Sequence, residues 1–262
     1  MSDPESPRDP EPLDEKLLYD VTLDYATLDD ATDGMPAPFE DEEQYGFFGG
    51  LWATLTETLG DPVGFFRRTR TDGNILDAYL YALIVSGLPG ALSGVINGLV
   101  GSHFQLHGTQ LAITLYATAA FPLTIFVMSC ISAGVIQVVL GMLGAEVRPW
   151  RRTLRVVMVS SGPGAIQVFG IVAALIAALL MRGSDSPIGS MITGIVGGII
   201  GLTVAIWSMS ITVRGLQRVH ATSAGHAWIA VLAMPVLMVF AMLIGAVVLY
   251  SLYGDMLRKM AG

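Results

Sequence analysis

The sequence predicts an all-α, polytopic protein that is integral to a membrane and crosses it with five helices. Of its 262 residues, 53% are hydrophobic and only 14% are charged, whereas soluble domains carry about 25% charged residues. The hydrophobic residues gather in five stretches of the length that a helix needs to cross the hydrocarbon core. Because a backbone in lipid must satisfy its own hydrogen bonds, these stretches are predicted to be helices rather than open strands.

The five predicted spans are consecutive and leave no room for a second globular domain. They cover residues 77–100, 111–143, 154–181, 187–213 and 227–252. The second is too long for one perpendicular crossing, so it must tilt, extend beyond the bilayer or bend near Pro122. We therefore predict one five-helix membrane domain over residues 77–252 and a short C-terminal tail over residues 253–262.

Basic residues are concentrated at one set of helix ends. Nine flank the ends that share a side with the N-terminus: Arg67, Arg68, Arg70, Arg148, Arg151, Arg152, Arg155, Arg214 and Arg218. The other side has three: Arg182, Arg258 and Lys259. Because basic flanks are retained in the cytoplasm, we expect a multi-pass protein of the cytoplasmic (inner) membrane with its N-terminus in the cytoplasm.

Residues 1–45 are predicted to be a disordered, acidic, cytosolic tail. They hold 15 of the 22 acidic residues and two basic ones, a net charge of −13, and are rich in proline and aspartate. Such a composition cannot bury enough apolar area to fold alone. The start also lacks the basic and apolar regions of a signal peptide, so we expect no cleavage.

One apolar stripe interrupts this tail and is a candidate partner-binding site. Its residues lie three or four apart, so a helix would place them on one face: Leu18, Val21, Tyr25 and Leu28. A disordered segment of this kind can fold into an apolar groove of a cytosolic protein, with Lys or Arg at the rim. The alternative is a solvated spacer.

Residues 46–76 are predicted to be an amphipathic segment with a short helix in the membrane interface. Aromatic and aliphatic residues recur at roughly helical spacing around Trp52, and an aromatic pair directly precedes two arginines. A helix lying in the interface would bury such a face. We assign these residues to the interface: Trp52, Phe65, Phe66, Arg67 and Arg68. The alternative is a plain connector with aromatic anchors.

Glycines at four-residue spacing mark two candidate packing faces. In the first span they are Gly90, Gly94 and Gly98, and in the fourth Gly194, Gly197, Gly198 and Gly201. This spacing places glycines on one helix face, where two backbones can approach closely. We predict helix packing or a homo-oligomer through these faces. The alternative is that glycine is simply common in membrane helices.

The third span is interrupted near its start by Ser160, Ser161, Gly162, Pro163 and Gly164. The proline and glycines break the backbone ladder, while the serine hydroxyls can bond back to freed carbonyls. A transporter site needs a second, corresponding break and ionisable groups well inside the spans. We find no second break of this quality, and the charges near the spans can snorkel to the interface. The interruption is interpreted as a bend, with a membrane site as the alternative.

Signals for catalysis are weak. His103 and His107 are four apart, but the adjoining loop offers no carboxylate, and His220 and His226 are six apart and would not share a helix face. No serine has a histidine and aspartate setting that suggests a nucleophile, and no phosphate-binding glycine loop is present. We expect no enzyme activity, no cofactor, no metal ion and no nucleic acid.

Three stretches resemble the Yip family of membrane proteins, named for interaction with Ypt/Rab GTPases, and its prokaryotic-type members in particular. They are "DPVGFFRRTR" at 61–70, "LRVVMVSSGP" at 154–163 and "IWSMSITVRGLQRVHATSAGHAWIAVLAMP" at 206–235. Positions that match the family motif include Arg155, Trp207, Gly215 and His220. The resemblance implies a five-helix membrane protein that organises membranes or trafficking through protein contacts. The Asp-Leu-Tyr-Gly-Pro motif of eukaryotic members is absent.

These observations lead to one expected function and one alternative. We expect a non-catalytic integral membrane scaffold or membrane-organising protein that acts through helix packing and a cytosolic tail. Its partners would be the lipid bilayer, a second copy of the chain and a cytosolic protein. The alternative is a small transporter or channel.

Overall fold

The computed structural model describes residues 34–92, 95, 108–180 and 187–261, and within these ranges the chain is helical without a named strand. Five segments there are long and apolar enough to cross a membrane: Ile75–Leu92, Thr118–Met142, Trp150–Val172, Ile195–His220 and Ala224–Val248. The predicted all-α membrane fold is confirmed. Several predicted positions lie outside the described residues: Leu18, Val21, Tyr25, Leu28, Gly94, Gly98, His103 and His107.

The first span is not a uniform α-helix. It begins with α5 (Ile75–Ala82), whose first turn is capped by the Asn74 side chain, which accepts a hydrogen bond from the Leu76 N–H at 3.0 Å. It continues as η2 (Leu83–Gly87), one turn of π-helix in which the Leu88 N–H bonds to the Leu83 carbonyl. Pro89 has no N–H to donate to the carbonyl four residues earlier, so the α-helical ladder cannot run unchanged through this point.

The second and fifth spans lie in helices longer than a bilayer is thick. The second belongs to α7 (Gly108–Met142) and the fifth to α11 (Ala224–Ala261). At 1.5 Å per residue, 35 residues extend about 50 Å, which agrees with the predicted excess length of the second span. The Tyr79 hydroxyl donates to the Pro122 carbonyl at 3.0 Å and so ties α5 to α7. Between Val236 and Val248, α11 exposes apolar side chains, a surface suited to lipid.

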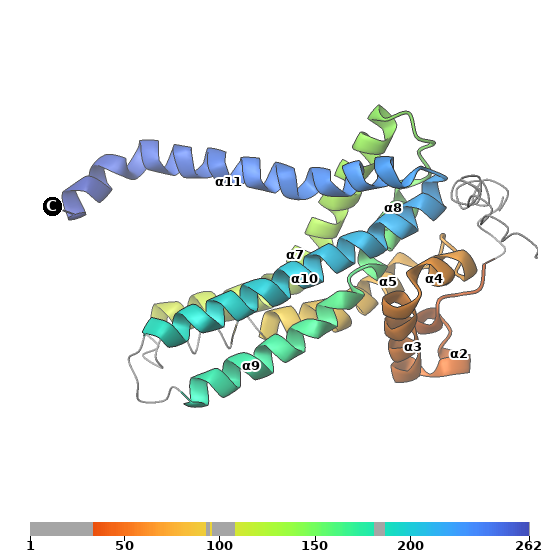
Figure 1. Cartoon of the computed structure of the whole chain (residues 1–262), viewed down its shortest axis with the longest axis horizontal. Helices are drawn as coiled ribbons and strands as arrows, with labels where there is room; N and C mark the ends of the chain where they lie inside the picture. Colours follow the sequence, from red (N-terminus) through yellow and green to blue (C-terminus); the bar gives the residue numbers. More distant parts are fainter. Residues whose placement is uncertain (1–33, 93–94, 96–107, 181–186, 262) are drawn as a thin grey trace, which may run out of the picture. The chain divides into compact units, whose positions relative to one another are not determined.

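The third span contains the predicted break. Helix α8 (Trp150–Val159) ends at the two serines, and η3 (Gly162–Ile166) is a 3₁₀ segment. Helix α9 (Gln167–Leu180) then continues the span and lies beside α10 (Pro187–His220) (Figure 1). The chain therefore leaves α-helical geometry where Pro163 removes a backbone donor.

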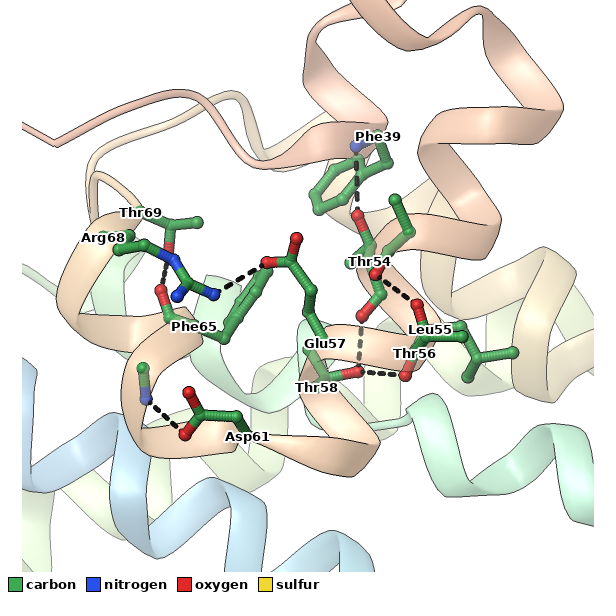
Figure 2. A network of polar contacts seen from close by, with 12 residues as sticks. Phe39, Thr54, Leu55, Thr56, Glu57, Thr58, Asp61, Phe65, Arg68 and Thr69 are labelled. Carbon is green, nitrogen blue, oxygen red and sulfur yellow. Dashed lines mark hydrogen bonds and ion pairs between the residues drawn. The ribbon is translucent and has the colours of Figure 1, made fainter.

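The described part of the segment before the first span, from residue 34 onward, is largely helical. It forms η1 (Pro38–Glu40), α2 (Glu42–Tyr45), α3 (Phe47–Gly60) and α4 (Pro62–Arg68). The Asp61 side chain accepts the Gly64 N–H at 2.8 Å and caps α4 (Figure 2). Our expectation of disorder up to residue 45 is wrong for residues 34–45, because they form η1 and α2, the Met35 backbone bonds to Arg68 and Arg70, and Ala37 and Pro38 are buried.

Two residues assigned to the membrane interface lie in the protein core instead. Phe65 and Phe66 are buried, and their rings meet edge to face at 5.2 Å. The reason is Gly215 on α10, where a Cβ would lie 2.9 Å from the Phe66 ring and 2.5 Å from the Val156 side chain. Because glycine has no side chain, α4, α8 and α10 converge at this point and enclose the aromatic pair.

Substitution of Gly164 should destabilise the fold. A Cβ at this position would lie 2.5 Å from the Ser86 Cβ and 2.9 Å from its Cα, so backbone would have to move. Gly164→Ala is expected to cost about 1–3 kcal/mol, as overpacking does, and to lower the melting temperature in detergent micelles. The matched control is Gly197→Ala, because no other atom of the described chain lies within 4 Å of its Cβ position. Equal melting temperatures would contradict this packing argument.

Candidate functional site

A buried ion pair joins α8 to the N-terminal segment. The Arg155 guanidinium donates to Glu40 Oε1 from NH2 at 2.7 Å and from Nε at 3.2 Å. Only 7% of the Arg155 side chain and 2% of the Glu40 side chain are exposed. Arg155 NH1 donates to the Arg70 carbonyl, and the Ala37 N–H donates to Glu40 Oε2 at 3.1 Å. The two charges are therefore desolvated, paired and further hydrogen-bonded, the arrangement in which a buried pair is stable.

Backbone pairing and aromatic stacking hold Glu40 in place. The Met35 N–H donates to the Arg68 carbonyl at 2.8 Å, and the Arg70 N–H donates to the Met35 carbonyl at 2.9 Å. The Phe39 ring stacks on Tyr81 with centroids 5.2 Å apart. These contacts fix the chain before and within η1, so the Glu40 carboxylate faces Arg155. We expected the Arg155 side chain to snorkel to the membrane interface. This expectation is wrong, because the guanidinium is paired with Glu40 inside the protein.

A second polar cluster surrounds His220, which is fully buried at the end of α10. The Arg148 N–H donates to His220 Nδ1 at 3.2 Å, and His220 Nε2 lies 2.9 Å from the Thr153 hydroxyl oxygen. His220 Nδ1 also lies 3.2 Å from the Glu146 carbonyl oxygen, so this ring nitrogen faces one backbone donor and one backbone acceptor. The Gln137 amide donates to the Arg148 carbonyl at 2.7 Å and to the Thr153 hydroxyl at 3.2 Å. The cluster thus links α7, α8 and α10.

Three of the four family-motif residues meet around the first turns of α8. Thr153 contacts His220, Arg155 contacts Glu40, and Val156 contacts the Gly215 backbone. Trp207 is the exception, since it is exposed on α10 and lies about 20 Å along the helix axis from His220 at 1.5 Å per residue. Sequence reasoning missed Glu40, Thr153 and Gln137, because no spacing along the chain relates Glu40 to Arg155, or Thr153 and Gln137 to His220.

The break in the third span is a site of close packing. The Ser160 hydroxyl donates to the Val156 carbonyl and the Ser161 hydroxyl to the Met158 carbonyl, each at 2.7 Å. A Cβ on Gly162 would lie 3.0 Å from the Tyr81 hydroxyl oxygen and 3.1 Å from the Thr58 hydroxyl oxygen. The buried glycines of η3 therefore let α3 and the first span approach its backbone directly.

The first span supplies a second break, which our sequence interpretation had denied. The π-helical turn η2 lies against the 3₁₀ segment η3, with Ser86 touching Gly164. The sequence signal for it is Pro89, which lies within the predicted first span. Two segments without α-helical hydrogen bonding thus meet inside the membrane-spanning part of the chain.

The remaining predicted positions divide into packed and open ones. Gly90 lies against the second and third spans, since a Cβ there would be 2.8 Å from the Phe121 ring and 3.4 Å from the Gln167 amide oxygen. On α10 the described chain leaves Gly197, Gly198 and Gly201 without a neighbour within 4 Å of a Cβ, and Gly194 lies on the same helix. At the proposed interface, Trp52, Arg67 and Arg68 are exposed. Among the described residues, no group of three or more His, Cys, Asp or Glu could hold a metal ion.

Breaking the ion pair from one side should be costly. Glu40→Gln leaves the buried Arg155 without its counter-charge, and Arg155→Met leaves the buried Glu40 with only the half-exposed Arg70 at 3.8 Å. Each change is expected to cost about 3–5 kcal/mol. The double variant Glu40→Met/Arg155→Met removes both charges and should recover most of the stability. Thermal unfolding of the full chain in detergent micelles would measure this cycle, and strictly additive losses would contradict a direct pairing.

Comparison with known proteins identifies the family. The model of the Yip1 domain matches residues 56–247, which include Arg155, Trp207, Gly215 and His220 and leave Glu40 outside. No match was found among curated proteins or among solved structures. The domain match covers most of the chain and coincides with the five apolar helices. The chain belongs to the Yip1 domain family.

Proposed function

We propose that this protein is a non-catalytic integral membrane scaffold or membrane-organising protein. The observation that carries the proposal is the use of the family-motif side chains at α8. Arg155 bonds to Glu40 and to a backbone carbonyl, and His220 bonds to Thr153 and to the Arg148 backbone. Groups that could bind or transform a substrate are instead occupied in holding helices together, which is the property a scaffold requires.

The orientation and the protein partner belong to the same proposal. The arginine end, defined as the helix ends that carry Arg70, Arg148 and Arg218, would face the cytoplasm of a cell whose inner membrane holds the protein. Residues 34–40 are fixed at this end by Met35 and Glu40. Any cytosolic protein that binds the acidic residues 1–33 would therefore be held beside the membrane surface.

A small transporter or channel is the second candidate, and one observation favours it. Transporters bind substrates where two interrupted helices meet within the membrane, and η2 and η3 are two such segments in contact. Gln167, at the start of α9, brings an amide close to Gly90 in the first span. These groups could serve a polar solute, whereas the scaffold proposal treats them as packing.

Solute flux in reconstituted vesicles separates the two candidates. The scaffold proposal expects vesicles that contain the protein to show the same leak of ions and small polar solutes as empty vesicles. It also expects Pro163→Ala, at the break, to change thermal stability without changing flux. A flux that requires the protein and is lost in a folded Pro163→Ala variant would favour the transporter and refute the scaffold.

Self-association through α10 is testable separately. Gly197 and Gly198 have no close neighbour in the described chain, so Gly197→Ile/Gly198→Ile should leave the fold of one chain intact. If two copies meet on this face, the added side chains hold the backbones apart. We expect a smaller oligomer by light scattering in detergent, with Gly134→Ile on α7 as the control, because that glycine is also open within the chain. An unchanged oligomer would show that lipid alone covers the face.

A further inference from the structure

Helix α3 has its polar and apolar faces reversed relative to a helix in water. The buried residues of α3 are Gly50, Thr54 and Thr58, and the partly buried Leu55 and Leu59 pack against the protein beside them. The opposite face carries Phe48, which is 81% exposed, and Trp52, which is 67% exposed. A helix at a water-covered protein surface buries its large apolar residues and exposes its small polar ones. The exposed face of α3 is therefore suited to an apolar neighbour.

Hydrogen bonds fix this reversed orientation. The Thr54 hydroxyl oxygen accepts the Phe39 N–H at 3.1 Å, and the Thr58 hydroxyl donates to the Thr54 carbonyl at 2.7 Å (Figure 2). A side chain at Gly50 would lie 3.0 Å from the Phe39 Cα, so η1 leaves no room for a larger residue there. The aromatic residues cannot turn inward without breaking these contacts, so they remain on the outer face.

The position of α3 places this face at the entry of the membrane spans. The Thr58 hydroxyl lies 3.5 Å from the Tyr81 hydroxyl, and both lie within reach of Gly162. Tyr81 belongs to the first span and Gly162 to the third. In Figure 1, α3 is drawn across the direction of α9 and α10 rather than along it. A helix beside the entry of two spans and across their direction is placed as interfacial helices are.

We infer that Phe48 and Trp52, flanked by Tyr45 and Phe47, insert into the phospholipid layer at the arginine end. Tryptophan prefers this boundary between headgroups and acyl chains. The four side chains are exposed, and the Phe47 and Phe48 rings meet edge to face at 5.2 Å. They form one aromatic patch whose occupant is lipid. This inference rests on membrane integration and is independent of the scaffold proposal.

The charges near the patch indicate that the contact is apolar rather than electrostatic. Asp41, Glu42 and Glu43 directly precede it, and the two glutamates are exposed. Glu57 and Arg68 form an ion pair at 3.2 Å, so the Arg68 guanidinium already has a carboxylate partner besides any lipid phosphate. Anionic headgroups are repelled by the acidic residues. Neutral phosphatidylcholine should therefore be sufficient for insertion.

Depth-dependent fluorescence quenching tests the inference on the full chain in vesicles. Trp150, Trp207 and Trp228 are changed to Phe so that Trp52 is the only tryptophan, which is excited selectively over the tyrosines. In phosphatidylcholine vesicles, lipids brominated near the headgroup should quench Trp52 severalfold more strongly than lipids brominated deep in the chain or aqueous iodide. Replacing part of the lipid with anionic phosphatidylglycerol should leave the quenching unchanged.

The control places the fluorophore on the polar side of the same region. With Trp52→Phe added to the other three changes, Glu43→Trp should be quenched by iodide and not by brominated lipid. Quenching of Trp52 by iodide alone would show that water covers the patch, and quenching by neither agent would show a protein neighbour. Either result overturns the inference. If the tryptophan variants do not fold, a spin label at Phe48→Cys in a Cys130→Ser background gives the same depth from oxygen and nickel-chelate accessibility.

Discussion

The first turns of α8 carry the contacts on which the arginine end of the molecule depends. Three neighbouring residues bind three different partners: Thr153 bonds to His220, Arg155 to Glu40, and Val156 lies against Gly215. Each contact joins α8 to an element far away in the sequence. Because buried polar groups are costly when unpaired and stable when paired, these contacts select one arrangement of the helices. This explains why three of the four family-motif residues, Arg155, Gly215 and His220, gather there.

The two helix interruptions follow from the same requirement that backbone groups in a membrane be satisfied. Pro89 and Pro163 each remove a donor from a membrane-spanning segment, and the chain responds with a π-helical turn and a 3₁₀ segment. Serine hydroxyls compensate in the third span. Glycines at the break then let the irregular segments approach more closely than regular helices with side chains would. The helix interruptions are therefore also the sites of close helix packing. A transport site would have to use the same glycine and serine groups.

The segment that precedes the first span packs against the membrane-spanning helices. Residues 34–55 lie outside the matched domain, yet they supply Glu40 to Arg155. Thr58 of α3, just inside the match, lies 3.5 Å from the Tyr81 hydroxyl of the first span and close to Gly162 of the third. The inward threonines leave the aromatic residues of α3 outside. The same packing that completes the ion pair therefore also presents Phe48 and Trp52 to the surroundings.

The sequence by itself determined the five membrane spans, the all-α fold, the family and the position of the break near Pro163. These features depend on local composition and on backbone chemistry, which do not change with the position of a segment in the fold. The tertiary structure decided which side chains meet. Arg155 was identified from the sequence, but its partner is 115 residues away. Phe65 and Phe66 were predicted to lie at the membrane interface, but the absence of a side chain at Gly215 leaves room for them in the core. The spacing of residues along the chain does not predict these contacts. Whether two distant segments can pack together depends on where the other helices lie and on how much room their side chains leave.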